Sequence, residues 1–174
     1  MPKKYIVDAN VFIQGKNLHY DFSFCTGFWD WIADGHQAGV IFSIQKVRDE
    51  LLKGVKGDAG RQWAMAMPPT FFLEDKNDPT VMTEYGKIIQ WSINDTHYQQ
   101  QAKTRFAEEK RADAFLLAYA KAHQHEIVTQ EKSNPDKKKE IPIPDAAIKL
   151  GGIKTLTIYE LLTTHAKPTF IFKP

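Results

Sequence analysis

The sequence has only one cysteine, Cys25, among its 174 residues. A single thiol cannot form a disulfide within the chain, and it excludes a zinc site built from cysteine pairs. Chains without disulfides are typical of reducing compartments, so we expect a cytoplasmic protein. We expect Cys25 itself to be a half-buried core residue rather than a nucleophile.

The sequence also lacks a long hydrophobic run. No apolar stretch approaches the ~20 residues that a transmembrane helix requires, so we expect no membrane contact. The first four residues, MPKK, precede a strand pattern that contains an acid, which is not the pattern of a signal peptide. Neither sign of charge dominates, since the net charge is +2, and this balance supports nucleic-acid binding only weakly.

The length, without internal repeats or linkers, predicts one domain over residues 1–174, since domains usually hold ~100–200 residues. Short apolar runs predict strands at 5–7, 40–42, 126–129 and 154–157, and a strand or loop at 71–73. Helical spacing and capping residues predict helices at 24–36, 44–53, from Pro79 to about Trp91, 105–123, 146–150 and 158–164. This alternation predicts an α/β fold, a three-layer α/β/α sandwich with a central, mostly parallel sheet.

The most informative segment is KYIVDANVFI, residues 4–13. Its first apolar run has no polar break and is typical of a buried parallel strand, which places Asp8 at the carboxyl end. Ligands bind at this edge of open α/β sheets, and a carboxylate there needs a cation or hydrogen-bond donors to offset its desolvation. Asn10 can bond back to Asp8 or cap the following helix. The alternative is an Asx turn that merely leads into a helix.

Four further acids follow or border the predicted elements: Glu50, Asp113, Glu131 and Asp145. Glu50 and Asp113 lie at the edge of an apolar helix face, where acids are less common than on the opposite face. Glu131 follows a strand directly, and Asp145 begins a helix. Structural explanations also exist. Glu50 could pair with a neighbouring basic residue, Asp113 could favour a helix start, and Asp145 could be an N-cap.

Together the acids predict a metal site. We expect the strands at 5–7 and 126–129 to be central neighbours, and the flanking helices to bring their acids to the same edge of the sheet. Carboxylates gathered there raise each other's pKa unless a divalent cation lies among them. Oxygen ligands without cysteine or paired histidine select Mg²⁺ or Mn²⁺, ions that activate water for phosphodiester hydrolysis in nucleases.

The segments YIVDANVFI, VRDELLKG, KRADAFLLAYA and IVTQEKSN, in this order and spacing, resemble the PIN domain across nearly the whole chain. The later IPIPDAA segment is similar to an uncharacterised bacterial PIN-like subfamily close to the VapC-type toxins. The resemblance implies an α/β/α fold and a ribonuclease that depends on Mg²⁺ or Mn²⁺. It also implies an RNA substrate and, as in many members, a toxin with a cognate antitoxin and a homodimer.

By this resemblance, Asp8, Glu50 and Asp113 fill the three principal acid positions, which are catalytic and bind the metal. The fourth position is usually an aspartate two residues after a serine or threonine at a strand end. Here Thr129 is followed two residues later by Glu131, which keeps the charge on a longer arm.

The resemblance leaves the fourth acid open between Glu131 and Asp145. Asn10 matches a small polar position that orients the first acid, and Thr129 is placed for the same role. Basic residues beside the acid-bearing segments are candidates for contacts with the RNA backbone, although solvated helix faces explain each one equally well. These candidates are Lys46, Lys53 and Arg111, with Lys56, Arg61, Lys103, Arg105 and Lys110 also nearby.

Two other functions fit parts of the sequence. Phosphatases of the haloacid dehalogenase type also begin with a strand that ends in an acid, but they need a second aspartate where this chain has Asn10. A PIN scaffold that binds nucleic acid or a partner protein without cutting would be marked by lost acids. The three principal acids are present, and only the Glu131 substitution favours this alternative.

Overall fold

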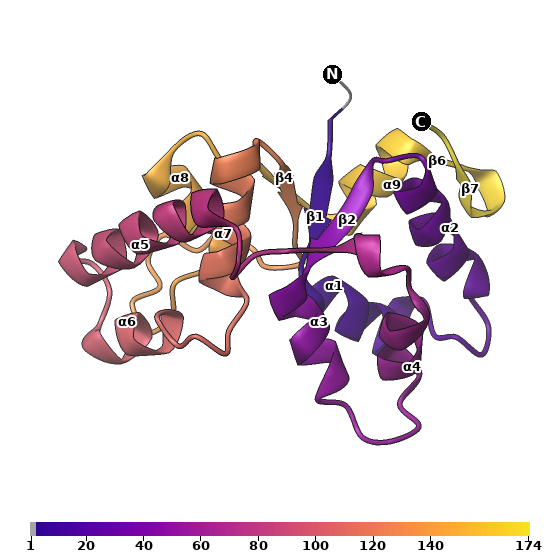
Figure 1. The fold of residues 1–174 in the computed structure, drawn as a ribbon, viewed down its shortest axis with the longest axis horizontal. Coiled ribbons are helices and arrows are strands. Elements are labelled where there is room, and N and C mark those ends of the chain that lie inside the picture. Colours follow the sequence, from indigo (N-terminus) through magenta and orange to yellow (C-terminus); the bar gives the residue numbers. More distant parts are fainter. Residues whose placement is uncertain (1–2) are drawn as a thin grey trace.

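A computed structural model describes residues 3–174 of the chain. Five short strands form one parallel sheet in the order β3–β2–β1–β4–β5, with β1 at its centre (Figure 1). The strands are β1 (Tyr5–Val7), β2 (Ile41–Ile44), β3 (Phe72–Leu73), β4 (Glu126–Val128) and β5 (Thr155–Leu156). β4 pairs directly with β1, which confirms the predicted neighbours. A separate antiparallel pair, β6 (Ala166–Lys167) and β7 (Ile171–Phe172), was not predicted.

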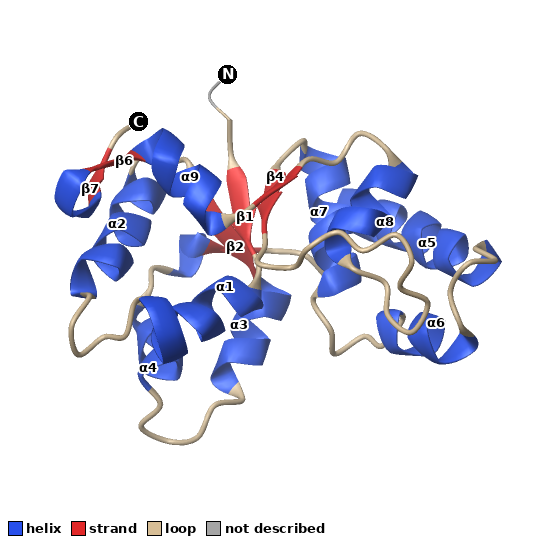
Figure 2. Ribbon diagram, turned by 180° about the vertical axis from the view of Figure 1, so that it is seen from behind, coloured by secondary structure: helices blue, strands red, loops and turns tan. Residues whose placement is uncertain are grey.

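Helices flank the sheet on both sides, with α5 to α8 on one side and α2 and α9 on the other (Figures 1 and 2). The α-helices are α1 (Ala9–Gln14), α2 (Thr26–Gln37), α3 (Gln45–Leu52), α4 (Ala59–Ala66), α5 (Pro79–Asn94), α6 (Gln100–Phe106), α7 (Asp113–His123), α8 (Ile143–Leu150) and α9 (Ile158–His165). Shorter turns are the π-helical η1 (Gly15–His19) and the 3₁₀ turns η2 (Pro69–Phe71) and η3 (Pro168–Phe170). This α/β architecture agrees with the predicted three-layer sandwich.

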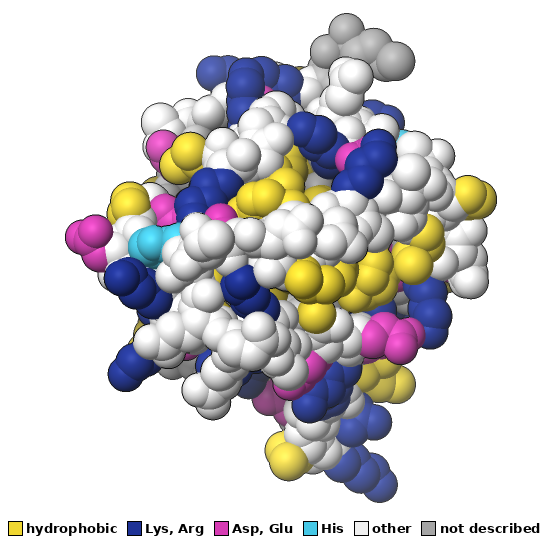
Figure 3. Space-filling view, turned by 90° about the vertical axis from the view of Figure 1, so that its left-hand side faces the viewer, with side chains coloured by type: hydrophobic (Ala, Val, Ile, Leu, Met, Phe, Trp, Pro, Cys, Tyr) yellow, Lys and Arg dark blue, Asp and Glu magenta, His cyan; other side chains and the backbone are white. Residues whose placement is uncertain are grey.

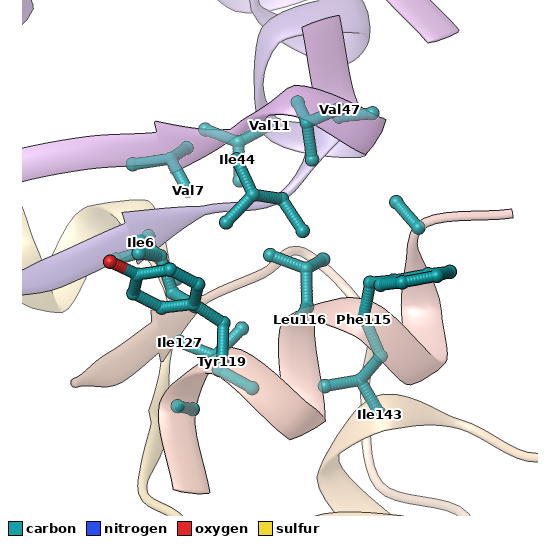
Figure 4. Packing of buried hydrophobic residues seen from close by; sticks show 14 of the residues in the cluster. Ile6, Val7, Val11, Ile44, Val47, Phe115, Leu116, Tyr119, Ile127 and Ile143 are labelled. Carbon is teal, nitrogen blue, oxygen red and sulfur yellow. The ribbon is translucent and has the colours of Figure 1, made fainter. Parts of the chain in front are cut away.

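The hydrophobic core surrounds the central strand. Ile6 of β1 and Ile127 of β4 are paired neighbours, and both are fully buried. Figure 4 shows Ile44, at the end of β2, pointing toward Leu116 of α7. A strand covered on both faces has no polar side to present to water. The continuous apolar runs of the sequence therefore follow from the position of these strands inside the molecule.

The C-terminal segment packs against α2. Trp31 of α2 is fully buried, and its Nε1 donates to the carbonyl of His165 at 2.9 Å. Gly35 lies one turn further along the same helix. A Cβ atom at Gly35 would be 2.5 Å from Cδ1 of Ile41 and 3.0 Å from Cε2 of Phe172. The close approach of α2 to the sheet therefore depends on a residue without a side chain.

The helix predicted at 105–123 is wrong in its first half. α6 ends at Phe106, α7 begins at Asp113, and a loop without glycine or proline separates them. A tertiary hydrogen bond explains the break, because the N–H of Ala112 donates to the Glu50 carboxylate at 3.0 Å. This contact overrides the local helix propensity of the segment. It also places Asp113 in the first turn of a helix.

The proline-rich segment also differs from the prediction. α8 begins at Ile143 rather than after Asp145, with Pro142 as its N-cap residue. Pro144 occupies the first helical turn, where a missing N–H breaks no intrahelical hydrogen bond. Asp145 therefore lies inside the first turn and is not the N-cap that was considered. Because proline is tolerated at a helix start, α8 begins three residues earlier than the predicted helix at 146–150.

The surface of the described chain has features that the sequence indicated, such as the half-buried Cys25, and features that it did not, such as the exposed hydrophobic side chains described below. Within residues 3–174, no helix is long and apolar enough to cross a membrane. Met1 and Pro2, which begin the MPKK segment discussed above, lie outside the described residues. Cys25 immediately precedes α2 and is half-buried, as expected. The side formed by α5 and α6 exposes hydrophobic side chains among Lys and Arg (Figure 3).

Two helical glycines give a matched pair of variants. Gly35→Ala is expected to lower the free energy of unfolding by about 1–3 kcal/mol, because the new methyl group collides with buried Ile41. Gly86→Ala in α5 is expected to raise it by about 0.5–1 kcal/mol, because a Cβ there meets no atom within 4 Å and alanine favours the helix. Urea denaturation measures both. Equal effects of the two substitutions would contradict the packing described for α2.

Candidate active site

The carboxyl end of β1 is the centre of the candidate site. Val7 of β1 pairs with Val128 of β4, so the residues that follow them, Asp8 and Thr129, lie side by side. The N–H of Asp8 donates to the carbonyl of Val128 at 2.9 Å, and α1 begins directly after Asp8. The backbone thus fixes the Asp8 carboxylate at the edge of the sheet, where the residue is only 4% exposed.

The hydroxyl of Thr129 joins three segments. It donates to Oδ2 of Asp8 at 2.9 Å, and it accepts from Nδ2 of Asn10 and the N–H of Glu131, each at 3.1 Å. One donor and two acceptors are the whole capacity of a hydroxyl group. Oδ1 of Asn10 in turn accepts the N–H of Gln130 at 3.0 Å. Asn10 and Thr129 are therefore positioned for the orienting roles expected of them.

Glu50 and Asp113 come from two different helices. Oε1 of Glu50, in the last turn of α3, accepts the N–H of Ala112 at 3.0 Å. That bond fixes α3 to the residue that directly precedes Asp113. Oδ2 of Asp113 accepts a hydrogen bond from Nη2 of Arg111 at 3.2 Å. Two helices and the loop before α7 are thus joined beside the sheet edge.

Glu131 and Asp145 differ in how their oxygens are used. Oε2 of Glu131 accepts the N–H of Ile143, the first residue of α8, at 2.6 Å. Asp145 accepts the Ser133 hydroxyl at 2.5 Å on Oδ1 and the N–H of Asn134 at 2.8 Å on Oδ2. Both oxygens of Asp145 therefore shape the loop after β4. This arrangement favours Glu131 as the fourth acid.

Burial and mutual repulsion raise the pKa values of Asp8, Glu50 and Glu131. Burial is the largest cause that raises the pKa of Asp8 well above its ordinary value. The charges of Asp113 and Glu131 also raise the pKa of Asp8, and the charge of Glu50 adds a smaller part. Burial raises the pKa of Glu50 as well, and it raises the pKa of Glu131 to about 7. The four carboxylates therefore form one electrostatic cluster.

The four carboxylates share a pattern of hydrogen bonding. In each, one oxygen accepts from a protein donor: Oδ2 of Asp8, Oε1 of Glu50, Oδ2 of Asp113 and Oε2 of Glu131. The second oxygen of each accepts no hydrogen bond within residues 3–174, and such oxygens are the donors that Mg²⁺ and Mn²⁺ prefer. In the present side-chain positions, however, no group of three or more His, Cys, Asp or Glu side chains within residues 3–174 is close enough together to hold a metal ion. Binding of one ion by several of these carboxylates would require their side chains to move.

The three foremost candidates for nucleic-acid contacts have different environments. Arg111 lies within the site, and its Nε is buried without a hydrogen-bond partner in the described chain. Lys53 is exposed at the C-terminal end of α3. Lys46 is 9% exposed, and its Nζ lies 4.9 Å from the centre of the Phe115 ring. Lys46 therefore packs against the core and is less available to a phosphate than the other two.

A pocket of about 530 Å³ opens beside Asp113 and Glu131. It lies between α6, the loop before α7 and the loop after β4, and we call it the α6 pocket. Its lining includes Lys137 and Glu140, which belong to the charged run at residues 137–140 and were not among the predicted site residues. Only the tertiary fold brings this run beside the acids, so no local sequence pattern indicated it.

The raised pKa of Glu131 predicts how stability depends on pH. Its pKa rises from 4.5 to about 7 on folding, so the folded state keeps a proton that the unfolded state has released. In EDTA, the free energy of unfolding should therefore fall as the pH rises through this window. Glu131→Gln should flatten that fall, whereas Glu84→Gln on α5 should leave it in place. Urea denaturation across the window measures the slope, and an unchanged slope in Glu131→Gln would contradict the assignment.

Comparison with known proteins identifies a family that has no assigned activity. The family model described as a domain of unknown function, DUF4411, matches residues 5–169. This range contains the whole five-stranded sheet and all four acids of the cluster. A search of curated proteins gave no match. The match covers nearly the entire chain, and the chain therefore belongs to the DUF4411 family.

Proposed function

We propose that the chain is a metal-dependent ribonuclease that hydrolyses RNA phosphodiester bonds at a PIN-type acid site. The observation that carries the proposal is the cluster of Asp8, Glu50, Asp113 and Glu131 at the carboxyl edge of a parallel sheet. Burying carboxylates that repel one another destabilises their charged forms. Strongly perturbed groups of this kind, gathered beside a pocket, are typical of functional sites.

The donor set fits Mg²⁺ or Mn²⁺ by its chemistry. The carboxylate oxygens that accept no hydrogen bond from residues 3–174, on Asp8, Glu50, Asp113 and Glu131, would hold the ion. Asp145, whose two oxygens are both engaged, would support the loop instead. When bound, such an ion lowers the pKa of water and stabilises the charge that develops on the phosphate.

The residues around the acids would position the reacting groups. Thr129 and Asn10 restrain the Asp8 carboxylate, so its unbonded oxygen keeps one direction. Arg111 uses one nitrogen on Asp113, and a guanidinium has further donors that match the oxygens of a phosphate. Because the pKa values of Asp8 and Glu131 are raised in the absence of a cation, ion binding would lower these pKa values and favour the release of protons.

The biological setting of the proposal comes from the PIN resemblance. It comprises a cytoplasmic toxin, a cognate antitoxin protein that keeps the enzyme inactive, and a homodimer. The single half-buried Cys25 is compatible with a reducing compartment.

A second candidate function is a scaffold that binds nucleic acid or a partner protein without cutting. The observation that favours it is the absence, among residues 3–174, of three side chains grouped to hold an ion. The glutamate at the fourth position agrees with this alternative. The two functions differ in whether added metal produces cleavage.

The first test is cleavage of RNA by the purified chain in Mn²⁺, in Mg²⁺ and in EDTA. Cleavage should require a metal, and Asp8→Asn should lower its rate by more than about 100-fold, because even indirect ligand partners are worth 10–100-fold. Asp30→Asn, on the exposed face of α2, is the matched control and should cut as the parent does. A folded Asp8→Asn chain that cuts at the parent's rate would refute the nuclease. Manganese binding without cleavage would support the scaffold.

Thr129 provides a separate test of the orienting contacts. Thr129→Val removes the hydroxyl that donates to Asp8 and should lower cleavage by about 10–100-fold. Thr129→Ser keeps the hydroxyl and should retain most of the activity. Rates are compared at equal fractions of folded protein, measured by circular dichroism. Full activity in Thr129→Val together with a loss in Thr129→Ser would show that the methyl group, and not the hydroxyl, is what matters.

A further inference from the structure

The α6 pocket contains an acid that is surrounded by cations. Oε2 of Glu140 lies 2.5 Å from Nζ of Lys137, and its Oε1 lies 3.7 Å from Nη1 of Arg105. Arg111 lines the same pocket, and its charge adds to those of Lys137 and Arg105 in lowering the pKa of Glu140. The Glu140 carboxylate therefore lies in the field of three basic side chains, of which Arg111 also bonds to Asp113.

The backbone holds these cations in place. The carbonyl of Lys138 accepts the N–H of Gln99, and the carbonyl of Lys137 lies 3.1 Å from Nε2 of His97. Both contacts fix the loop after β4 against the segment that leads into α6, and Figure 2 shows this loop running toward α6. The basic side chains are therefore attached to a restrained surface rather than to a freely moving tail.

The carboxylate is held only weakly. The Glu140 side chain is 50% exposed, and those of Arg105 and Lys137 are 45% and 40% exposed. Ion pairs exposed to this degree contribute little to stability and are readily exchanged. Another anion that reached the pocket could replace the carboxylate. A phosphate is such an anion, because guanidinium groups bind its oxygens in a bidentate manner.

We propose that Arg105, Arg111 and Lys137 form a subsite for a backbone phosphate of single-stranded RNA, and that Glu140 is a built-in competitor for this subsite. The proposal rests on the proposed function for its choice of RNA. The pocket also borders Asp113 and Glu131, so a strand bound there passes directly beside the acid cluster. Its volume of about 530 Å³ lies within the ~300–1,000 Å³ that is usual for small-ligand sites.

The test is binding of a fluorescent single-stranded RNA of about eight nucleotides to the full chain in EDTA, measured by anisotropy. Arg105→Gln and Lys137→Gln should each weaken binding by about 5-fold near 0.1 M salt and reduce the salt slope by about 0.7. Glu140→Gln should strengthen binding by about 2–5-fold, which lies within the ~1.4–5-fold that one exposed ion pair is worth. Weaker binding in the Arg105 and Lys137 variants, together with stronger binding in the Glu140 variant, is what a competing carboxylate predicts.

A second pair of residues supplies the control. Glu84 and Lys87 on α5 form an ion pair with the same three-residue spacing, at 2.6 Å, outside the α6 pocket, in which the Lys87 side chain is 66% exposed and that of Glu84 is 19% exposed. Lys87→Gln changes the net charge as Lys137→Gln does, and Glu84→Gln changes it as Glu140→Gln does. Both control variants should alter binding by less than 2-fold, because only cations that contact the RNA phosphates release counterions. Effects equal to those of Lys137→Gln and Glu140→Gln would overturn the subsite, as would undetectable binding by the parent chain.

Cleavage of the same RNA in Mn²⁺ is measured in parallel. Binding effects in the α6 pocket without any cleavage would refute the nuclease and leave the subsite intact. Cleavage without the binding effects would refute the subsite alone.

Discussion

The pairing of β1 with β4 is the constraint on which the site depends, and the Thr129 hydroxyl transmits it to the acids. Asp8 and Thr129 are 121 residues apart in the sequence, yet parallel pairing places them side by side. The hydroxyl then uses its full hydrogen-bonding capacity on Asp8, Asn10 and Glu131. A shift of the register by one residue would turn these side chains to opposite faces of the sheet, so the core that fixes the register also fixes the site.

The same sheet edge combines rigid packing with electrostatic strain. Ile6 and Ile127 are fully buried and resist rearrangement. They form the strand pair next to Val7 and Val128, the pair that directly precedes the site. Beyond them, burial and neighbouring charge raise the pKa of Asp8 and Glu131. The apolar interior therefore supplies the low-dielectric surroundings that make the carboxylates repel. Their unfavourable energy is balanced by the core and would be relieved by a cation.

The sequence was sufficient for the elements that depend on local pattern, and insufficient where distant contacts decide. The apolar runs predicted the central strands, and the capping signal at Pro79 predicted the start of α5, because these signals lie within a few residues. The break before Asp113 depends on a bond from Ala112 to Glu50, which are 62 residues apart, so no local pattern could indicate it. The N-cap role considered for Asp145 was wrong, because α8 begins at Ile143 and the Asp145 carboxylate bonds to Ser133 and Asn134 instead.

The parallel topology also dictates when the site can form during folding. Contacts between segments so distant in sequence carry a large loop-closure entropy and are made late. A chain synthesised only as far as α7 contains Asp8, Glu50 and Asp113 but lacks the strand that supplies the Thr129 hydroxyl. The acid cluster is therefore incomplete until β4 has been translated and has docked against β1. Assembly of the site therefore requires that β4 has paired with the central strand, whether or not β5 has joined the sheet.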